Sequence, residues 1–141
     1  MPAPEPNGFI KTHNNMGFMT STVAGLRKTF SWLKPGGKLI VVAETPYLRN
    51  FQSFIPIYEN QKAAGMLWLG FVEDVMQIAP KRGAALPKTM HFLDPEVLQR
   101  VALQVGFVVE KCNTFARPEF PEDIRFDGRE SVGMIARKPW L

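Results

Sequence analysis

The 141-residue sequence has one cysteine, two histidines and no long apolar run. Cys112 cannot form a disulfide within the chain and is consistent with a reducing compartment, so we expect a cytoplasmic protein. His13, His91 and Cys112 do not have the spacing of metal ligands, so we expect no metal site. No stretch approaches the roughly 20 apolar residues of a membrane span, so we expect no membrane association.

The net charge of the chain is small and positive. The 17 Lys and Arg residues exceed the 13 Asp and Glu residues, and the formal net charge is +4. These basic residues are spread along the chain and form no run, which favours a solvated surface over a nucleic-acid site. A small basic nucleic-acid binder is therefore the least favoured function.

The first 15 residues are rich in proline, glycine and asparagine and lack the basic start and apolar core of a signal peptide. We expect residues 1–15 to be a flexible lead-in. With 45% hydrophobic residues, the remainder, 16–141, is expected to form one globular domain.

The most informative segment is 30–47, which combines a helix end, a tight turn and a strand. Pro35 cannot continue a helix and Gly36-Gly37 allow the chain to reverse, so the preceding helix should end near Lys34. Residues 39–43 form an unbroken apolar run rich in β-branched residues, which predicts an interior strand of a parallel sheet, covered on both faces. The apolar face of the helix is formed by Val23, Leu26, Phe30 and Leu33.

Glu44 and Tyr47 directly follow this predicted strand. In open α/β sheets, ligands bind outside the carboxyl ends of the strands, so both residues are candidates for binding substrate. The alternative is that Glu44 is simply solvated and that Tyr47 packs. Both interpretations remain open at this stage.

A second helix is predicted to begin at Asp94, with Pro95 at its first position, and to run to about Gln104. Gly106 is expected to end it in the left-handed conformation. Two strands, 107–112 and 131–137, should follow and pair antiparallel, because a loop rich in turn residues separates them.

Two runs of residues resemble class I S-adenosylmethionine-dependent methyltransferases. Leu33-Lys-Pro-Gly-Gly-Lys-Leu39 is similar to the turn before their fifth strand, and His91-Phe-Leu-Asp-Pro-Glu-Val-Leu98 with Val105-Gly-Phe107 is similar to their last helix and its exit. The resemblance extends from about Thr20 to Pro139. It implies an α/β, Rossmann-like methyltransferase fold that is incomplete on its N-terminal side and holds strands 5 to 7, their flanking helices and a helical insertion.

The resemblance also implies S-adenosylmethionine as cofactor. The family binds it with a glycine-rich loop after the first strand and an acidic residue ending the second, and this sequence contains neither feature. The first four strands are therefore expected to lie outside this chain or to be absent, which leaves cofactor binding by this chain alone open. Asn14 and Asn15 resemble the exit of the family's fourth strand, where the cofactor is often contacted, and are the candidate cofactor-binding residues.

The segment 48–90 is too long for an ordinary connection and too apolar to be disordered. In the family, insertions after the fifth strand often cover the substrate pocket, so this segment resembles a lid, with Tyr58 and Trp68 as candidate substrate-binding residues. The alternative is a helical hairpin that only extends the core. His91 is a candidate general base because its pKa lies near neutrality, and its alternative is a capping or packing role.

Two main functions follow. The chain resembles the acceptor-side, C-terminal part of a methyltransferase that acts on an unknown methyl acceptor. Alternatively, it is a non-catalytic binding or assembly module that pairs with a partner chain, such as a missing N-terminal half, or with itself as a homodimer, because a half-sheet with an exposed edge recruits partners.

Overall fold

The computed structural model describes residues 9–13, 19–66, 69–81 and 86–140. Helices and strands alternate along the chain, as expected for an α/β protein. In chain order the elements are β1 (Phe9–His13), α1 (Met19–Trp32), β2 (Lys38–Glu44), the 3-10 helix η1 (Arg49–Phe51), α2 (Ile55–Ala63), β3 (Phe71–Val72), α3 (Val75–Ile78), β4 (Met90–His91), α4 (Pro95–Val105), β5 (Val108–Phe115) and β6 (Ser131–Arg137).

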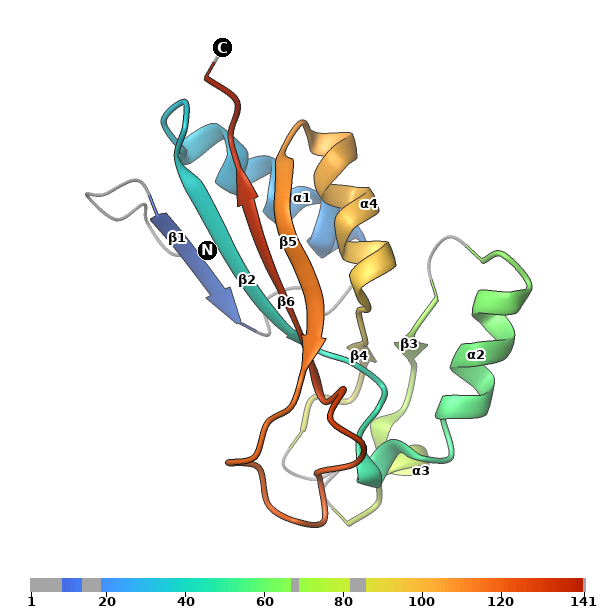
Figure 1. Ribbon diagram of the computed structural model, residues 1–141. Coiled ribbons are helices and arrows are strands. Elements are labelled where there is room, and N and C mark those ends of the chain that lie inside the picture. The colour runs from blue at the N-terminus through green and yellow to red at the C-terminus, as the bar shows by residue number, and fades with distance from the viewer. Residues whose placement is uncertain (1–8, 14–18, 67–68, 82–85, 141) are drawn as a thin grey trace.

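The main sheet has the strand order β1-β2-β6-β5 (Figure 1). Strand β1 pairs parallel with β2, whereas β6 pairs antiparallel with both β2 and β5. The predicted antiparallel final pair is thus confirmed, as is the interior position of β2. Residues 9–13 differ from our expectation of a flexible lead-in, because they form β1 once β2 supplies a hydrogen-bonding partner.

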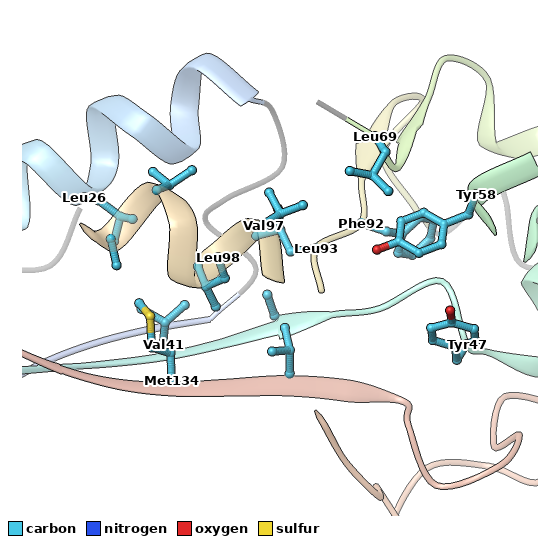
Figure 2. Packing of buried hydrophobic residues seen from close by; sticks show 14 of the residues in the cluster. Leu26, Val41, Tyr47, Tyr58, Leu69, Phe92, Leu93, Val97, Leu98 and Met134 are labelled. Carbon is cyan, nitrogen blue, oxygen red and sulfur yellow. The ribbon is translucent and has the colours of Figure 1, made fainter. Parts of the chain in front are cut away.

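Helices α1 and α4 lie on the same face of this sheet (Figure 1). Leu26 of α1 and Leu98 of α4 pack toward Val41 of β2 and Met134 of β6, and these side chains are almost completely buried (Figure 2). The alternate residues of β2, among them Ile40 and Val42, are only partly buried. The prediction that both faces of β2 are covered is therefore wrong for the described residues, because α1 and α4 both lie on one side.

The turn between α1 and β2 is held by the C-terminal segment. Gly36 has a positive φ of 82°, and its N–H donates to the Lys138 carbonyl over 2.8 Å. The Lys138 N–H donates in return to the Gly37 carbonyl over 2.9 Å. The Trp140 ring lies against Gly36 so closely that a Cβ there would be 2.4 Å from ring carbons. The positive φ is the main requirement for glycine here, because the Trp140 ring is 73% exposed and can move away from an added Cβ.

Helix α4 begins and ends as predicted. The Asp94 carboxylate accepts a hydrogen bond from the Val97 N–H over 2.9 Å, and Pro95 occupies the first turn. Gly106 ends the helix in the left-handed conformation with φ 115°. Phe107 is buried and makes an edge contact with Phe30 of α1, with ring centroids 5.1 Å apart. The local signals set the ends of α4, and Phe107 packs the end of this helix against α1.

The segment between β2 and α4 contains η1, α2, α3 and the two-stranded sheet of β3 and β4 (Figure 1). It lies beyond the carboxyl end of β2, and its buried residues belong to the same hydrophobic cluster as those of β2, α4 and β6. Within the segment, Phe51 and Phe92 make an edge contact with ring centroids 4.7 Å apart. Its other buried residues include Phe54, Tyr58, Leu69, Val72, Val75 and Ala79. The insertion is therefore packed on the domain.

Candidate functional site at the carboxyl end of β2

Three segments meet where β2 ends. The Glu44 carbonyl accepts a hydrogen bond from the Leu93 N–H over 3.1 Å, which joins β2 to the start of α4. The Thr45 N–H donates to the Glu130 carbonyl over 3.2 Å, and the Thr45 hydroxyl donates to the Arg129 carbonyl. The β5–β6 loop is thereby held beside the chain that leaves β2. This is the edge of the sheet where open α/β folds bind ligands.

Tyr47 lies at the centre of this region. Its ring makes an edge contact with Tyr58 of α2, with centroids 6.0 Å apart (Figure 2). The Arg129 guanidinium carbon lies 3.7 Å from the Tyr47 ring centroid, which is a cation–π geometry. Burial raises the pKa of Tyr47, and the positive charge of Arg129 opposes that rise. The phenol therefore stays neutral at physiological pH.

Tyr58 is fully buried, and its hydroxyl donates to the Asp94 carboxylate. Burial raises the pKa of Tyr58 far above its usual range, and the hydrogen bond to Asp94 adds to the rise. The Lys62 ammonium lies 3.4 Å from both Asp94 and Glu96. Burial alone would lower the pKa of Lys62, but these two carboxylates outweigh it and the pKa is raised. We call Tyr47, Tyr58, Lys62, Asp94 and Arg129 the rim cluster.

Arg129 is fixed from its other side by Asp127, whose Oδ2 accepts from Nε over 2.9 Å. That hydrogen bond raises the pKa of Arg129 and lowers the pKa of Asp127. The Arg129 side chain nevertheless remains 45% exposed. It can therefore offer its charge to a bound molecule while it stacks on Tyr47.

Of the predicted substrate-binding residues, Tyr47 and Tyr58 are brought together, and Glu44 lies at the adjoining end of β2. Trp68 and the predicted cofactor residues Asn14 and Asn15 lie outside the described residues. Sequence reasoning did not find the roles of Lys62 and Arg129 in this site. Neither lies in a motif, and only the folding of α2 and the β5–β6 loop brings them to Tyr47.

His91 lies in β4, within the insertion. It is 94% buried, and its Nε2 is 2.6 Å from the Leu69 carbonyl, to which it donates if that nitrogen carries the proton. Burial lowers the pKa of His91, and the Leu69 hydrogen bond opposes this only in part. Its Nδ1 has no hydrogen-bond partner among the described residues. The imidazole is thus neutral and engaged with the backbone.

Cys112 is half-buried in β5, and burial raises the pKa of its thiol to about 11, which is unfavourable for a nucleophile. The described residues contain no cluster of three or more potential metal-ligating His, Cys, Asp or Glu side chains. None of the described helices is long and apolar enough to cross a membrane. A shallow hollow lies along the surface of α4, lined by Glu96, Gln99, Arg100, Leu103 and Gln104, and its Glu96 is 3.4 Å from Lys62 of the rim cluster.

The described residues do not by themselves fit S-adenosylmethionine. Gly36 and Gly37 form a turn at the amino end of β2, which is the opposite end from the rim cluster. Within the described ranges, no glycine-containing turn follows a parallel strand and opens a helix. The backbone N–H cradle that such turns provide is therefore not supplied by this part of the chain.

The sequence matches no protein-family model and no curated protein. Its structure is similar to a SAM-dependent methyltransferase from Methanosarcina mazei, with a TM-score of 0.62, 12% identity, and coverage of 100% of this chain and 64% of that chain. It is also similar to an S-adenosylmethionine-dependent methyltransferase from Mesorhizobium loti, with a TM-score of 0.58, 14% identity, and coverage of 97% of this chain and 65% of that chain. A SAM-dependent methyltransferase from Thermotoga maritima matches with a TM-score of 0.52, 18% identity, and coverage of 98% of this chain and 59% of that chain.

These similarities establish the fold. The chain has the α/β, Rossmann-like fold of class I S-adenosylmethionine-dependent methyltransferases. It spans 59 to 65% of the length of the three solved chains, so it holds only part of that fold. The order of its elements, with an antiparallel pair after the last helix, is that of the C-terminal part.

Proposed function

We propose that this chain supplies the acceptor-binding part of an S-adenosylmethionine-dependent methyltransferase. The observation that carries the proposal is the Tyr47–Arg129 stack at the carboxyl end of β2, next to a packed insertion. The fold and the position of this stack support an acceptor site rather than a cofactor site, because the described residues lack a glycine-rich cradle. The methyl donor is bound elsewhere in the complete enzyme.

In this proposal the rim cluster orients the acceptor. Arg129 and Lys62 are each nearly half exposed and present positive charge beside the neutral phenol of Tyr47. This combination favours an acceptor that carries an aromatic ring or a negative group. Tyr58 is buried and acts as a positioning residue, because it holds α2 against Asp94. Catalysis then depends on how precisely the acceptor is held.

We further propose that residues 48–90 act as a lid over this site. Its α2 carries Tyr58 and Lys62, so movement of this helix would alter the rim cluster directly. Long ordered insertions at a ligand-binding edge are often functional. We assign His91 to a positioning role inside the insertion, because its buried Nε2 is engaged with the Leu69 carbonyl.

The test is fragment binding followed by NMR. The probes are small phenols, aromatic carboxylates and aliphatic amines, each titrated into the isotopically labelled chain. We expect the aromatic carboxylates to shift the backbone amides of Tyr47, Tyr58 and Arg129, and we expect Tyr47→Leu or Arg129→Gln to abolish these shifts. Phe126→Leu is the matched control, because Phe126 is an exposed aromatic residue of the same β5–β6 loop.

Fragments that bind only elsewhere, or binding that neither rim variant weakens, would contradict the acceptor site. The division of roles has its own measurement, which is calorimetric titration with S-adenosylhomocysteine. We expect no heat of binding from this chain alone at millimolar ligand. Micromolar affinity would show that the cofactor site lies within this chain and would overturn the division.

A further inference from the structure

The Tyr47–Arg129 stack joins two segments that lie far apart in the sequence. Tyr47 belongs to the chain that leaves β2, and Arg129 lies near the end of the β5–β6 loop, residues 116–130. The Arg129 side chain is 45% exposed, and an arginine with that freedom samples many rotamers unless its backbone is fixed. The hydrogen bonds that hold the two backbones together therefore decide whether the stack is preformed.

One hydroxyl bridges the two backbones directly. The Tyr47 N–H donates to the Thr45 hydroxyl oxygen over 3.2 Å, and the same hydroxyl donates to the Arg129 carbonyl. Thr45 is fully buried, so water does not compete for these bonds. The Thr45 N–H donates to the Glu130 carbonyl over 3.2 Å, which continues the pairing of β2 with β6 beyond the strand ends. Thr45 thus sets the separation between the two residues of the stack.

A buried carboxylate closes the loop that carries Arg129. Glu130 is only 2% exposed. Its Oε1 accepts from the Arg117 N–H over 3.1 Å, and its Oε2 accepts from the Gly128 N–H over 2.6 Å. Burying a carboxylate is costly unless it is hydrogen-bonded in this way, and bonds to a charged acceptor are strong. Because Arg117 and Gly128 lie near the two ends of the loop, the Glu130 side chain holds those ends together beside Arg129.

The insertion holds the middle of the same loop. The Arg49 N–H of η1 donates to the Ile124 carbonyl over 2.9 Å. The guanidinium Nε of Arg49 donates to the carbonyls of Glu122 and Arg125 over 3.2 and 2.9 Å. The loop is thus anchored at its centre as well as at its ends, so the backbone of Arg129 has a fixed position relative to β2.

We propose that Thr45 and Glu130 are positioning residues of the acceptor site: the Thr45 hydroxyl and the Glu130 carboxylate hold Arg129 over Tyr47 before an acceptor binds. The consequence for acceptor binding rests on the proposed function. A preformed stack spares the acceptor the entropy cost of ordering a long arginine side chain. Loss of either group should therefore weaken binding of an aromatic carboxylate, although neither group needs to touch it.

Threonine variants test the hydroxyl. Thr45→Val removes the hydroxyl and keeps the branched shape, whereas Thr45→Ser keeps the hydroxyl. Thr29→Val is the matched control, because Thr29 is equally buried and its hydroxyl donates to the Leu26 carbonyl within α1 over 3.0 Å. Circular dichroism verifies that each variant folds. If Thr45→Val does not fold, Thr45→Ala takes its place.

The first measurement needs no ligand. The ring current of Tyr47 shifts the NMR signals of the Arg129 side chain, and Tyr47→Leu defines their unshifted positions. We expect Thr45→Val to move these signals toward the positions seen in Tyr47→Leu. Thr45→Ser and Thr29→Val should leave them in place. A threonine with a structural role alone would lower the stability of the chain without moving the Arg129 signals.

Glu130→Gln tests the carboxylate, and Glu119→Gln is its matched control, because Glu119 lies in the same loop with its side chain 60% exposed. The glutamine keeps one acceptor oxygen and loses the other. We expect Glu130→Gln to move the Arg129 signals in the same direction as Thr45→Val. Hydrogen exchange should become faster at the Arg117 or Gly128 amide, whose acceptor is lost. Glu119→Gln should change neither measurement.

The second measurement is the affinity for benzoate, titrated by NMR. We expect Thr45→Val and Glu130→Gln each to weaken benzoate binding by about three- to tenfold, which corresponds to the cost of ordering one long side chain. Thr45→Ser, Thr29→Val and Glu119→Gln should leave the affinity unchanged.

Arg129 signals that stay in place in both Thr45→Val and Glu130→Gln would overturn the proposal. Equal shifts in Thr45→Ser or Thr29→Val would also overturn it, because the Thr45 hydroxyl would then not be their cause. The proposed function fails by a different result, which is that benzoate does not bind the unaltered chain at Tyr47 and Arg129. In that case the Arg129 signals still decide whether Thr45 and Glu130 hold the stack.

Discussion

The Tyr58 hydroxyl donates to the same Asp94 carboxylate that caps helix α4. One carboxylate oxygen accepts from Tyr58 and Lys62, and the other accepts from the Val97 N–H. A single buried side chain therefore joins the insertion to the main domain. A substitution of Asp94 therefore removes contacts to both α2 and α4.

Tyr58→Phe should lower the free energy of unfolding by about 1–3 kcal/mol, because a hydrogen bond to a carboxylate is lost. Asp94→Ala should cost more, about 2–5 kcal/mol, since it also removes the helix cap and leaves the buried Tyr58 hydroxyl without its acceptor. Urea unfolding followed by circular dichroism measures both changes.

The matched control for this pair is Asp74→Ala. Asp74 caps the four-residue helix α3 through a 3.1 Å bond from the Met76 N–H, and that bond is exposed. Its loss should cost about 1 kcal/mol or less. Equal effects of the two Asp→Ala changes would contradict a joining role for Asp94.

His91 should make the fold sensitive to acid. Burial lowers its pKa in the folded chain below the 6.5 of an unfolded histidine, so the folded state binds fewer protons. The resulting stability is present above pH 6.5 and is lost as the pH falls through 6.5 toward the lower folded pKa. His91→Gln keeps a donor for the Leu69 carbonyl and should flatten this part of the stability profile.

Urea unfolding at a series of pH values measures that slope in both proteins. An NMR titration gives the folded pKa directly, and the signal missing from His91→Gln identifies His91 among the two histidines. A pKa at or above 6.5 in the folded chain would contradict the prediction.

Gly36→Ala should destabilise the chain by about 1–3 kcal/mol, mainly through its positive φ. The positive φ of 82° is unfavourable for alanine, and the added Cβ would meet the Trp140 ring at 2.4 Å. Gly65→Ala is the matched control, because Gly65 has φ 75° but no atom within 4 Å of its Cβ position. It should cost only about 1–2 kcal/mol.

The double variant Gly36→Ala, Trp140→Ala separates the two causes. Relative to Trp140→Ala alone, the Gly36 change should then cost no more than Gly65→Ala. Thermal or urea unfolding measures each free energy. An undiminished cost in the Trp140→Ala background would show that the ring contact contributes nothing to the requirement for glycine.

The sequence predicted those elements whose signals are local. Asp94 and Gly106 mark the ends of α4 because a cap and a left-handed turn depend on neighbouring residues alone. The strand 131–137 was predicted with its exact bounds, since an apolar run after a loop rich in turn residues is also local. The resemblance carried by the residues around Gly36 and Asp94 led to the correct fold.

The candidate site was only half predictable. Tyr47 was found because position after a buried strand is a property of the sequence. Arg129 and Lys62 were not, because each reaches Tyr47 or Asp94 from a distant part of the chain. Contacts of this kind exist only after packing and leave no periodic pattern.

The sequence by itself determined the ends of α4, the bounds of β6 and the glycine turn that leads into the interior strand β2. Only the tertiary structure decided that residues 9–13 form a strand, that β2 is covered on one face, and that Tyr58 shares Asp94 with α4. The reason is physical: hydrogen bonds within helices, caps and turns are set by near neighbours, whereas strand pairing and burial depend on which surfaces the folded chain brings together.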